Sequence, residues 1–377
     1  MHQAEDAGLL RLRPVNGAPE AGSTGGGSGN LPTATPARSG QHLVALDGLR
    51  GIAAIWVVFH HLGLLSSRGY LAVDFFFCLS GYIIGLAYEK RLQADLTVTE
   101  YMKIRLFRLY PMLFIGGLIG LALAGGGSPL VRQTLAEQPD LYWPAVAGQF
   151  LLIPYIVPAT AFLFNTPQWS IVFELVINFL HALLFRWLSV RVLVVITVFS
   201  AAMLIVIAHD REDLSLGANL ATFLPAIPRV TFGFTAGVLL FRLRKLWLPR
   251  MLAIPFGWLV LVLVLSFAVP TLPIPGLRTG GRAAFSVIVL YPLIVAAGAK
   301  CNANARFAVP LGLVSYPLYA IHYPIVEWAQ TWIAIHAADA GKPALVAMRL
   351  LVAAAVILLA WAMGKWVESP FLKWRQS

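Results

Sequence analysis

The chain has 377 residues, of which 59% are apolar and only 12% are charged. A soluble domain contains about 45–50% apolar and about 25% charged residues, and a single hydrophobic core stops growing at roughly 250–300 residues. The composition therefore excludes an ordinary soluble enzyme, a disordered chain and a coiled coil. It predicts a protein that is embedded in lipid. The formal net charge of +11 would suggest a nucleic-acid partner in a soluble chain, so the positions of the charges decide its meaning.

Residues 1–41 differ in composition from the rest of the chain. They contain the glycine-rich run 25–29 and the proline-rich run 31–36, and such a segment buries too little apolar surface to offset its ordering entropy. The segment lacks the basic start, apolar middle and small-residue cleavage site of a signal peptide. We predict a disordered cytoplasmic tail over 1–41.

From Leu43 onward, apolar stretches of the length that a spanning helix needs, about 17–25 residues, alternate with short breaks. The predicted spans are 43–65, 70–88, 109–125, 168–186, 190–208, 221–241, 251–269, 283–300, 308–336 and 343–366. The stretch 145–164 contains Pro154 and Pro158, and we expect a re-entrant or interfacial helix there. The predicted fold class is all-α, a polytopic membrane bundle of about ten transmembrane helices plus this one.

The basic residues predict the orientation of the bundle. With ten spans, 19 of the 28 Lys and Arg residues fall on the side of the tail, six fall on the other side and three lie within spans. Because cytoplasmic loops carry the excess of Lys and Arg, both termini are predicted to be cytoplasmic. A crossing by 145–164 would place the basic cluster 242–250 outside. The net charge thus reflects membrane topology, and we expect no nucleic-acid partner.

The first predicted span contains Asp47, Arg50, His60 and His61, and ionisable residues at membrane depth are usually functional. Arg50 and His61 are eleven residues apart, or about three helical turns and 16 Å, so they share a face, whereas His60 points about 80° away. Asp47 lies one turn before Arg50 and can pair with it. A histidine that is shielded from water can act as a general base near neutral pH, and an arginine can bind an anion. A structural ion pair with a packed His61 is the alternative interpretation.

Other polar residues fall at the edges or interiors of predicted spans. Asp74 opens the second span, and Ser170 and Glu174 share one face of a later span. Arg105 and Arg108 lie one turn apart before the third span, where they could hold a phosphate or could merely mark the cytoplasmic side.

Further ionisable residues lie inside predicted spans. His322 is mid-span, and Arg229 and Arg349 each need an acidic partner that the sequence does not name. His181 lies on an apolar face and is expected to be a packing residue.

No nucleotide-binding phosphate loop, HExxH, CxxC or GxSxG motif is present. Cys78 and Cys301 are distant from each other, so we expect packing residues rather than a disulfide, and no metal site. The pairs Gly81–Gly85, Gly116–Gly120 and Gly233–Gly237 have GxxxG spacing and predict close helix packing.

Six ordered motifs make residues 42–373 resemble the membrane-bound acyltransferase family 3, which includes bacterial carbohydrate O-acetyltransferases. They are 46–54 followed by His61, 73–82, 105–111, 169–174, 315–324 and 368–370. The family signature is an arginine, ten residues and a histidine, which Arg50 and His61 fit and His60 does not. Leu175 and Asn178 depart from the family pattern in the region of the acceptor pocket.

The resemblance implies transfer of an acyl group, usually acetyl, from cytoplasmic acyl-CoA to a sugar hydroxyl. Arg105 and Arg108 would receive the phosphates of CoA, and Arg50 would continue the path inward. His61 would be the general base, and Asp47 would orient Arg50. No metal would be needed.

The same resemblance gives the remaining polar residues acceptor roles. Glu174 would assist catalysis, and Ser170, His322 and Asp74 would bind the acceptor. The expected partners are a carbohydrate acceptor and membrane lipids, in the inner membrane of a bacterium. The chain would be the stand-alone form of the family, without a fused periplasmic esterase-like domain.

Two other functions remain open on the sequence. The intramembrane Arg, Asp, Glu and His residues could form a proton or ion relay in a transporter, or the chain could be an inactive scaffold in polysaccharide assembly. The acyl group, acetyl or succinyl, and the acceptor sugar are not defined by the residues.

Overall fold

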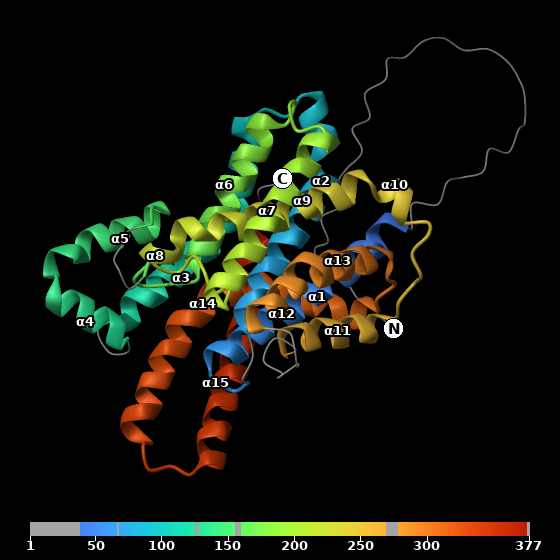
Figure 1. The fold of residues 1–377 in the computed structure, drawn as a ribbon. Coiled ribbons are helices and arrows are strands. Elements are labelled where there is room, and N and C mark those ends of the chain that lie inside the picture. The colour runs from blue at the N-terminus through green and yellow to red at the C-terminus, as the bar shows by residue number, and fades with distance from the viewer. Residues whose placement is uncertain (1–37, 66–67, 125–127, 155–159, 269–277, 375–377) are drawn as a thin grey trace, which may run out of the picture.

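The computed structural model describes residues 38–65, 68–124, 128–154, 160–268 and 278–374, and these residues form helices and contain no strand (Figure 1). The α-helices are α1 (Arg38–His61), α2 (Ala72–Ala94), α3 (Val98–Ala124), α4 (Pro129–Glu137), α5 (Tyr142–Leu151), α6 (Gln168–Leu184), α7 (Val190–Arg211), α8 (Leu220–Phe223), α9 (Ile227–Arg242), α10 (Arg244–Trp247), α11 (Phe256–Ala268), α12 (Thr279–Phe285), α13 (Tyr291–Lys300), α14 (Ala305–His336), α15 (Lys342–Met363) and α16 (Ser369–Trp374).

Short 3₁₀ and π-helical turns extend several of these helices. The 3₁₀ turns are η1 (Gly69–Leu71), η2 (Pro139–Leu141) and η3 (Leu224–Ala226), and the π-helical turns are η5 (Ser286–Leu290) and η6 (Gly364–Glu368). Such π-helical turns occur frequently at functional sites, and η6 contributes to the candidate site below.

The chain is a polytopic membrane helical bundle, as predicted. Each of the ten predicted spans overlaps helical residues, and seven helical segments of the described chain are long and apolar enough to cross a membrane. The count is lower than ten because α6 has 17 residues and α11 has 13, which gives about 26 Å and about 20 Å of helical rise. The 24-residue α1 is long enough, but its charged and imidazole side chains reduce its hydropathy.

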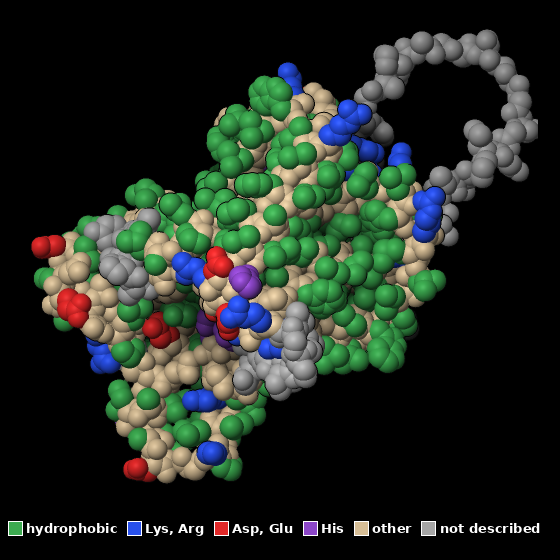
Figure 2. Space-filling view, in the orientation of Figure 1, with side chains coloured by type: hydrophobic (Ala, Val, Ile, Leu, Met, Phe, Trp, Pro, Cys, Tyr) green, Lys and Arg blue, Asp and Glu red, His purple; other side chains and the backbone are tan. Residues whose placement is uncertain are grey.

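Large apolar side chains cover the outside of the bundle, as Figure 2 shows over the visible face. On α7, Val195 and Phe199 are each 67% exposed. Monomeric soluble proteins rarely expose contiguous apolar surface of this extent. This exterior is suited to contact with lipid chains, in agreement with the predicted lipid partner.

Glycine pairs bring α2 and α9 into close contact. A Cβ atom at Gly81 would overlap the carbonyl oxygen of Phe234, and one at Gly237 would overlap the carbonyl oxygen of Cys78. Likewise, a Cβ atom at Gly116 on α3 would overlap the carbonyl oxygen of Ala320 on α14. The predicted close packing at GxxxG pairs is therefore confirmed, because only glycine lets these backbones approach so closely.

The helices α1 and α14 form the centre of the bundle and run in the same direction, since Arg50 contacts Ser315 and the His61 ring lies against that of His322. Buried apolar side chains of α1 pack on one side against α2 and α13 and on the other against α3, α14 and α15. One face of α1 therefore packs against α14.

The predicted re-entrant or interfacial stretch 145–164 contains the ten-residue α5, which is too short to span a bilayer. Residues 155–159 lie outside the described residues. The chain then returns into the bundle as a non-helical, buried segment, residues 160–165, where the Asn165 side-chain amide donates to the Ala320 carbonyl at 2.7 Å. Irregular backbone at membrane depth is tolerated when protein surrounds it in this way.

The predicted disordered tail falls almost wholly on residues 1–37, which lie outside the described residues. Helix α1 begins at Arg38, so it includes the last four residues of the predicted tail.

Candidate active site

Arg50 on α1 is held by its own helix and by α14. Its Nη2 atom lies 3.0 Å from an Asp47 carboxylate oxygen, so the predicted pair is present. Its Nε atom donates to the Ser315 hydroxyl at 2.8 Å, and Nη2 lies 3.4 Å from the Gly312 carbonyl. The guanidinium is therefore fixed from two helices, with 28% of the side chain still exposed.

Glu368 and Arg108 lie in the same electrostatic neighbourhood as Arg50. The Glu368 carboxylate of η6 is 8% exposed, and the positive charges of Arg108 and Arg50 act on it. Arg108 on α3 is half-buried. Sequence reasoning placed Glu368 in the closing motif but gave it no role in the site, although a carboxylate within an apolar helix was the available signal.

Arg105 and Glu174 pair with each other. The Arg105 Nη2 atom lies 2.6 Å from a Glu174 carboxylate oxygen, and the Ser80 hydroxyl donates to that same oxygen at 2.8 Å. The Arg105 side chain is only 9% exposed. The structure thus places the two predicted site residues in one buried ion pair between α3 and α6, so that Arg108 is the more accessible of the two arginines.

His61, at the end of α1, lies in a cluster of rings. Its ring centroid is 5.3 Å from that of His322, 5.1 Å from that of Tyr323 and 5.2 Å from that of His60. The Gln330 side chain donates to the His61 carbonyl at 2.5 Å. The structure therefore brings His61 together with His322, 261 residues away in the chain.

The backbone of α14 determines the tautomer of His322. Its Nδ1 atom lies 3.0 Å from the carbonyl oxygens of Leu318 and Tyr319, and a carbonyl can only accept, so Nδ1 carries the proton. The Nε2 atom then has a free lone pair. It is buried, with no hydrogen-bond partner in the described part of the chain. A buried unpaired imidazole nitrogen is costly, and this one is left as an acceptor on a ring that lies against that of His61.

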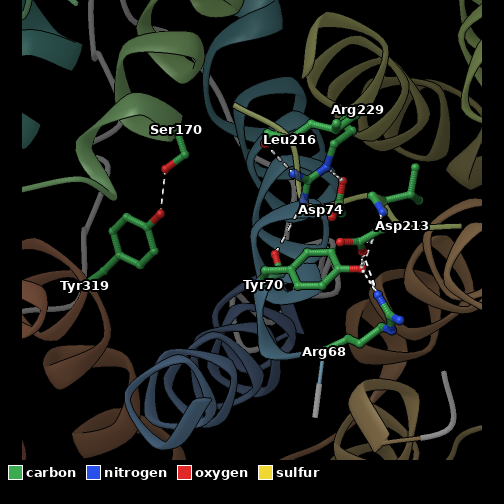
Figure 3. Close-up of polar contacts among 9 residues, drawn as sticks. Arg68, Tyr70, Asp74, Ser170, Asp213, Leu216, Arg229 and Tyr319 are labelled. Carbon is green, nitrogen blue, oxygen red and sulfur yellow. Dashed lines mark hydrogen bonds and ion pairs between the residues drawn. The ribbon is translucent and has the colours of Figure 1, made fainter. Parts of the chain in front are cut away.

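Asp74, which is predicted to bind the acceptor, bonds to Arg229 (Figure 3). Its two carboxylate oxygens accept from Arg229 at 2.9 and 2.5 Å, and both side chains are at most 1% exposed. Arg229 also donates to the Leu216 carbonyl at 2.7 Å. Asp74 is thus the acidic partner that the sequence could not name for Arg229, and the pair ties α2 to α9.

Ser170 shares a hydrogen bond of 2.6 Å with the Tyr319 hydroxyl, as Figure 3 shows. The Tyr319 ring in turn lies 5.9 Å from that of His322. Ser170 is buried, with 3% of its surface exposed. It is connected to His322 through Tyr319.

The remaining polar residues have other partners, although the Tyr70 ring lies 6.3 Å from that of His60. Arg68 and Tyr70 both donate to the Asp213 carboxylate (Figure 3). Arg349, for which an acidic partner was expected, has its Nη1 atom 3.5 Å from the Gly63 carbonyl instead. His181 packs between aromatic rings, as predicted.

The two cysteines, Cys78 and Cys301, are buried and free, which agrees with their predicted packing role. Among the described residues, no three His, Cys, Asp or Glu side chains form a group that could hold a metal ion.

The site thus has two parts on the shared face of α1 and α14. At one end, Arg50 pairs with Asp47, and the charges of Arg50 and of Arg108 on α3 both act on the Glu368 carboxylate. The imidazoles of His61 and His322 lie about 16 Å further along the bundle, from eleven residues of helical rise. Guanidiniums can hold an anion, and imidazoles can accept a proton near neutral pH.

Comparisons with known proteins agree with this arrangement. Residues 43–365 match the acyltransferase family 3, described as an acyltransferase domain. The chain is 33% identical to "Protein 2 in picA locus" of Rhizobium radiobacter over 187 residues, which is 45% of this chain and 96% of that protein. It is 41% identical to "O-acetyltransferase OatA" of Staphylococcus aureus (strain NCTC 8325 / PS 47) over 76 residues, 19% of this chain and 13% of that protein. No solved structure matches the chain. With the family covering most of its length and with its helical membrane bundle, the chain belongs to acyltransferase family 3 and is an integral membrane acyltransferase.

Proposed function

We propose that the protein transfers an acyl group, acetyl, from cytoplasmic acyl-CoA to a hydroxyl of a carbohydrate. The observation that carries this proposal is the polar face of α1, on which Arg50 is held by Asp47 and Ser315 and His61 lies against His322. The similarity to OatA, named as an O-acetyltransferase, supports acetyl as the group and oxygen as the acceptor atom.

Arg108 and Arg50 are the residues proposed to bind the donor. CoA carries several phosphate charges, and guanidiniums bind phosphate through paired, charge-assisted hydrogen bonds. Asp47 and Ser315 hold the Arg50 guanidinium in place before the donor arrives, which reduces the entropy lost on binding. Arg105 is neutralised by Glu174, so we assign this pair to shaping the donor site rather than to direct phosphate contact.

His61 is the proposed general base. A sugar hydroxyl is a poor nucleophile at neutral pH, and its attack on a thioester needs removal of its proton. In the proposed step, the hydroxyl oxygen bonds to the acyl carbon, the carbon–sulfur bond breaks, and the proton passes through His61 to the departing thiolate. The lone pair on His322 Nε2 can share that proton.

The excess of Lys and Arg in the loops on one side supports an orientation in which Arg50 and Arg108 lie toward the cytoplasm. Both termini are then cytoplasmic, and the membrane is the inner membrane of a bacterium. Acyl-CoA is a cytoplasmic metabolite, so this orientation puts Arg108 on the side where the donor is available.

A comparison of His61→Gln with His60→Gln tests the proposal. Membranes with either full-length variant receive radiolabelled acetyl-CoA, and acetyl transfer to the surface polysaccharide of the host is measured. Because positioned general bases contribute about 10²–10⁴-fold, His61→Gln is expected to lose at least 100-fold while His60→Gln stays active. Full transfer by His61→Gln would overturn the assignment. Solute or ion flux without dependence on acetyl-CoA would instead support a transporter.

A further inference from the structure

A hollow of about 430 Å³ opens beyond the histidine pair, between α4 and the last turns of α14. Its lining consists of Pro129, Arg132, Glu327, Gln330, Thr331, Ala334 and Ile335. Sites for small organic ligands commonly measure 300–1,000 Å³, so the hollow has room for a sugar unit. Nothing in the sequence motifs indicated this place.

The hollow lies on the side of the bundle opposite to the donor arginines. From Arg108 to the end of α3 at Ala124 there are 16 residues, or about 24 Å of helical rise. Ser128, just beyond α3, donates to the Glu327 carboxylate at 2.7 Å. In Figure 1 the lower half of α14 projects with α15 beyond the other helices, beside α4. A CoA held by Arg108 therefore keeps its phosphates far from this hollow.

The polar atoms around the hollow suit a molecule that is rich in hydroxyl groups. Ser128 occupies one oxygen of the Glu327 carboxylate, and the second oxygen is available as an acceptor. The Gln330 amide nitrogen is used on the His61 carbonyl, which leaves the amide oxygen as a second acceptor. Arg132 is exposed and supplies donors. Sugar hydroxyls both donate and accept, so they can satisfy all three groups.

The hollow is linked to the proposed base through one lining residue, Gln330. Gln330 bonds to the His61 carbonyl, so one wall of the hollow touches the residue that carries the base. Tyr323, whose ring is 5.1 Å from that of His61, lies one helical turn, about 6 Å, before Glu327 on the same face of α14. A sugar in the hollow therefore has to extend along α14 past Tyr323 to bring one hydroxyl to the imidazole.

We propose that the hollow formed by Arg132, Glu327, Gln330 and Thr331 binds the carbohydrate acceptor, on the opposite side of the bundle from the acyl donor. The inference rests on the proposed function and adds to it the place of the acceptor. It implies that the acyl group is transferred at His61, between the donor site of Arg50 and Arg108 and the acceptor in the hollow.

Filling the hollow tests this inference. Ala334 is exposed and lines the hollow, so Ala334→Trp places an indole there. Ala338 is exposed and lies four residues later, outside the lining, so Ala338→Trp is the matched control. Both variants are made in the full-length protein and assayed in membrane vesicles. The acceptor probe is the surface polysaccharide of the host after removal of its acyl groups with mild base, and the donor probe is radiolabelled acetyl-CoA.

Ala334→Trp is expected to lower acetyl transfer to the polysaccharide at least tenfold while acetyl-CoA binding stays within twofold of the parent chain, and Ala338→Trp is expected to change neither. Glu327→Gln, which removes only the charge, is expected to raise the KM for the polysaccharide and leave the KM for acetyl-CoA unchanged. Normal transfer by Ala334→Trp, or loss of acetyl-CoA binding with it, would overturn the acceptor assignment. If the parent chain itself neither binds acetyl-CoA nor acetylates the polysaccharide, the proposed function fails instead.

Discussion

The ring of His322 on α14 faces that of His61 on α1 across 5.3 Å, with 36° between their planes. Two carbonyl oxygens of α14 hold the proton of His322 on Nδ1, so its Nε2 atom is a buried acceptor without a partner among the described residues. A proton taken up by His61 can therefore be shared with the Nε2 atom of His322, and the first prediction rests on this.

Replacing His322 by Asn is expected to reduce acetyl transfer by about 10²-fold, in the range of one positioned proton-transfer group. The Asn amide can still donate to the carbonyl that Nδ1 meets, but it has no atom at the Nε2 position. Transfer rates in membranes, normalised to the amount of inserted protein, measure the effect. His322→Gln, whose amide reaches toward the Nε2 position, should retain more activity than His322→Asn, and the reverse order would contradict the role of Nε2.

Replacing Arg108 by Gln is expected to raise the KM for acetyl-CoA about tenfold, because one charge-assisted contact to phosphate contributes about 1.5–3 kcal/mol. The KM for acetyl-pantetheine, a thioester without the phosphates of CoA, should not change. Initial rates with the two donors separate these effects. Lys103→Gln, an exposed cation on the same helix, is the control and should leave both constants unchanged. An equal rise for both donors would place Arg108 away from the phosphates.

Replacing Asp74 by Asn is expected to lower the stability of the folded bundle by about 3–5 kcal/mol, because the Arg229 cation is left buried without its counter-charge. Thermal unfolding in detergent measures the loss. The double variant Asp74→Leu with Arg229→Met removes both charges and is expected to recover most of the stability. A double variant no more stable than Asp74→Asn would show that the pair itself stabilises the contact between α2 and α9.

Replacing Gly237 by Ala is expected to destabilise the bundle by about 1–3 kcal/mol, as overpacking of a tight contact does. The new Cβ atom would overlap the carbonyl oxygen of Cys78, which is backbone of α2 and cannot rotate away. Gly257→Ala on α11 is the matched control, since no atom lies within 4 Å of the new Cβ position. Its melting temperature in detergent should be unchanged or higher, and equal effects of the two substitutions would contradict the close packing of α2 and α9.

The sequence by itself was sufficient to predict the helical membrane bundle and the alignment of Arg50 with His61. Apolar stretches of spanning length are local features, and eleven residues on one helix place two side chains on the same face whatever the helix packs against. The same local reasoning predicted the Asp47–Arg50 pair and the close packing at the glycine pairs, and the structure has both.

Only the tertiary structure decided which distant groups meet. Arg105 and Glu174, 69 residues apart in the chain, form an ion pair that the sequence did not predict. Asp74 lies opposite Arg229, 155 residues away, and the closing segment brings Glu368 to Arg50 and Arg108. Helical periodicity determines the face on which a side chain lies, but not which helix packs there. That choice depends on the packing of the whole bundle, because a buried charge requires a partner wherever the fold provides one.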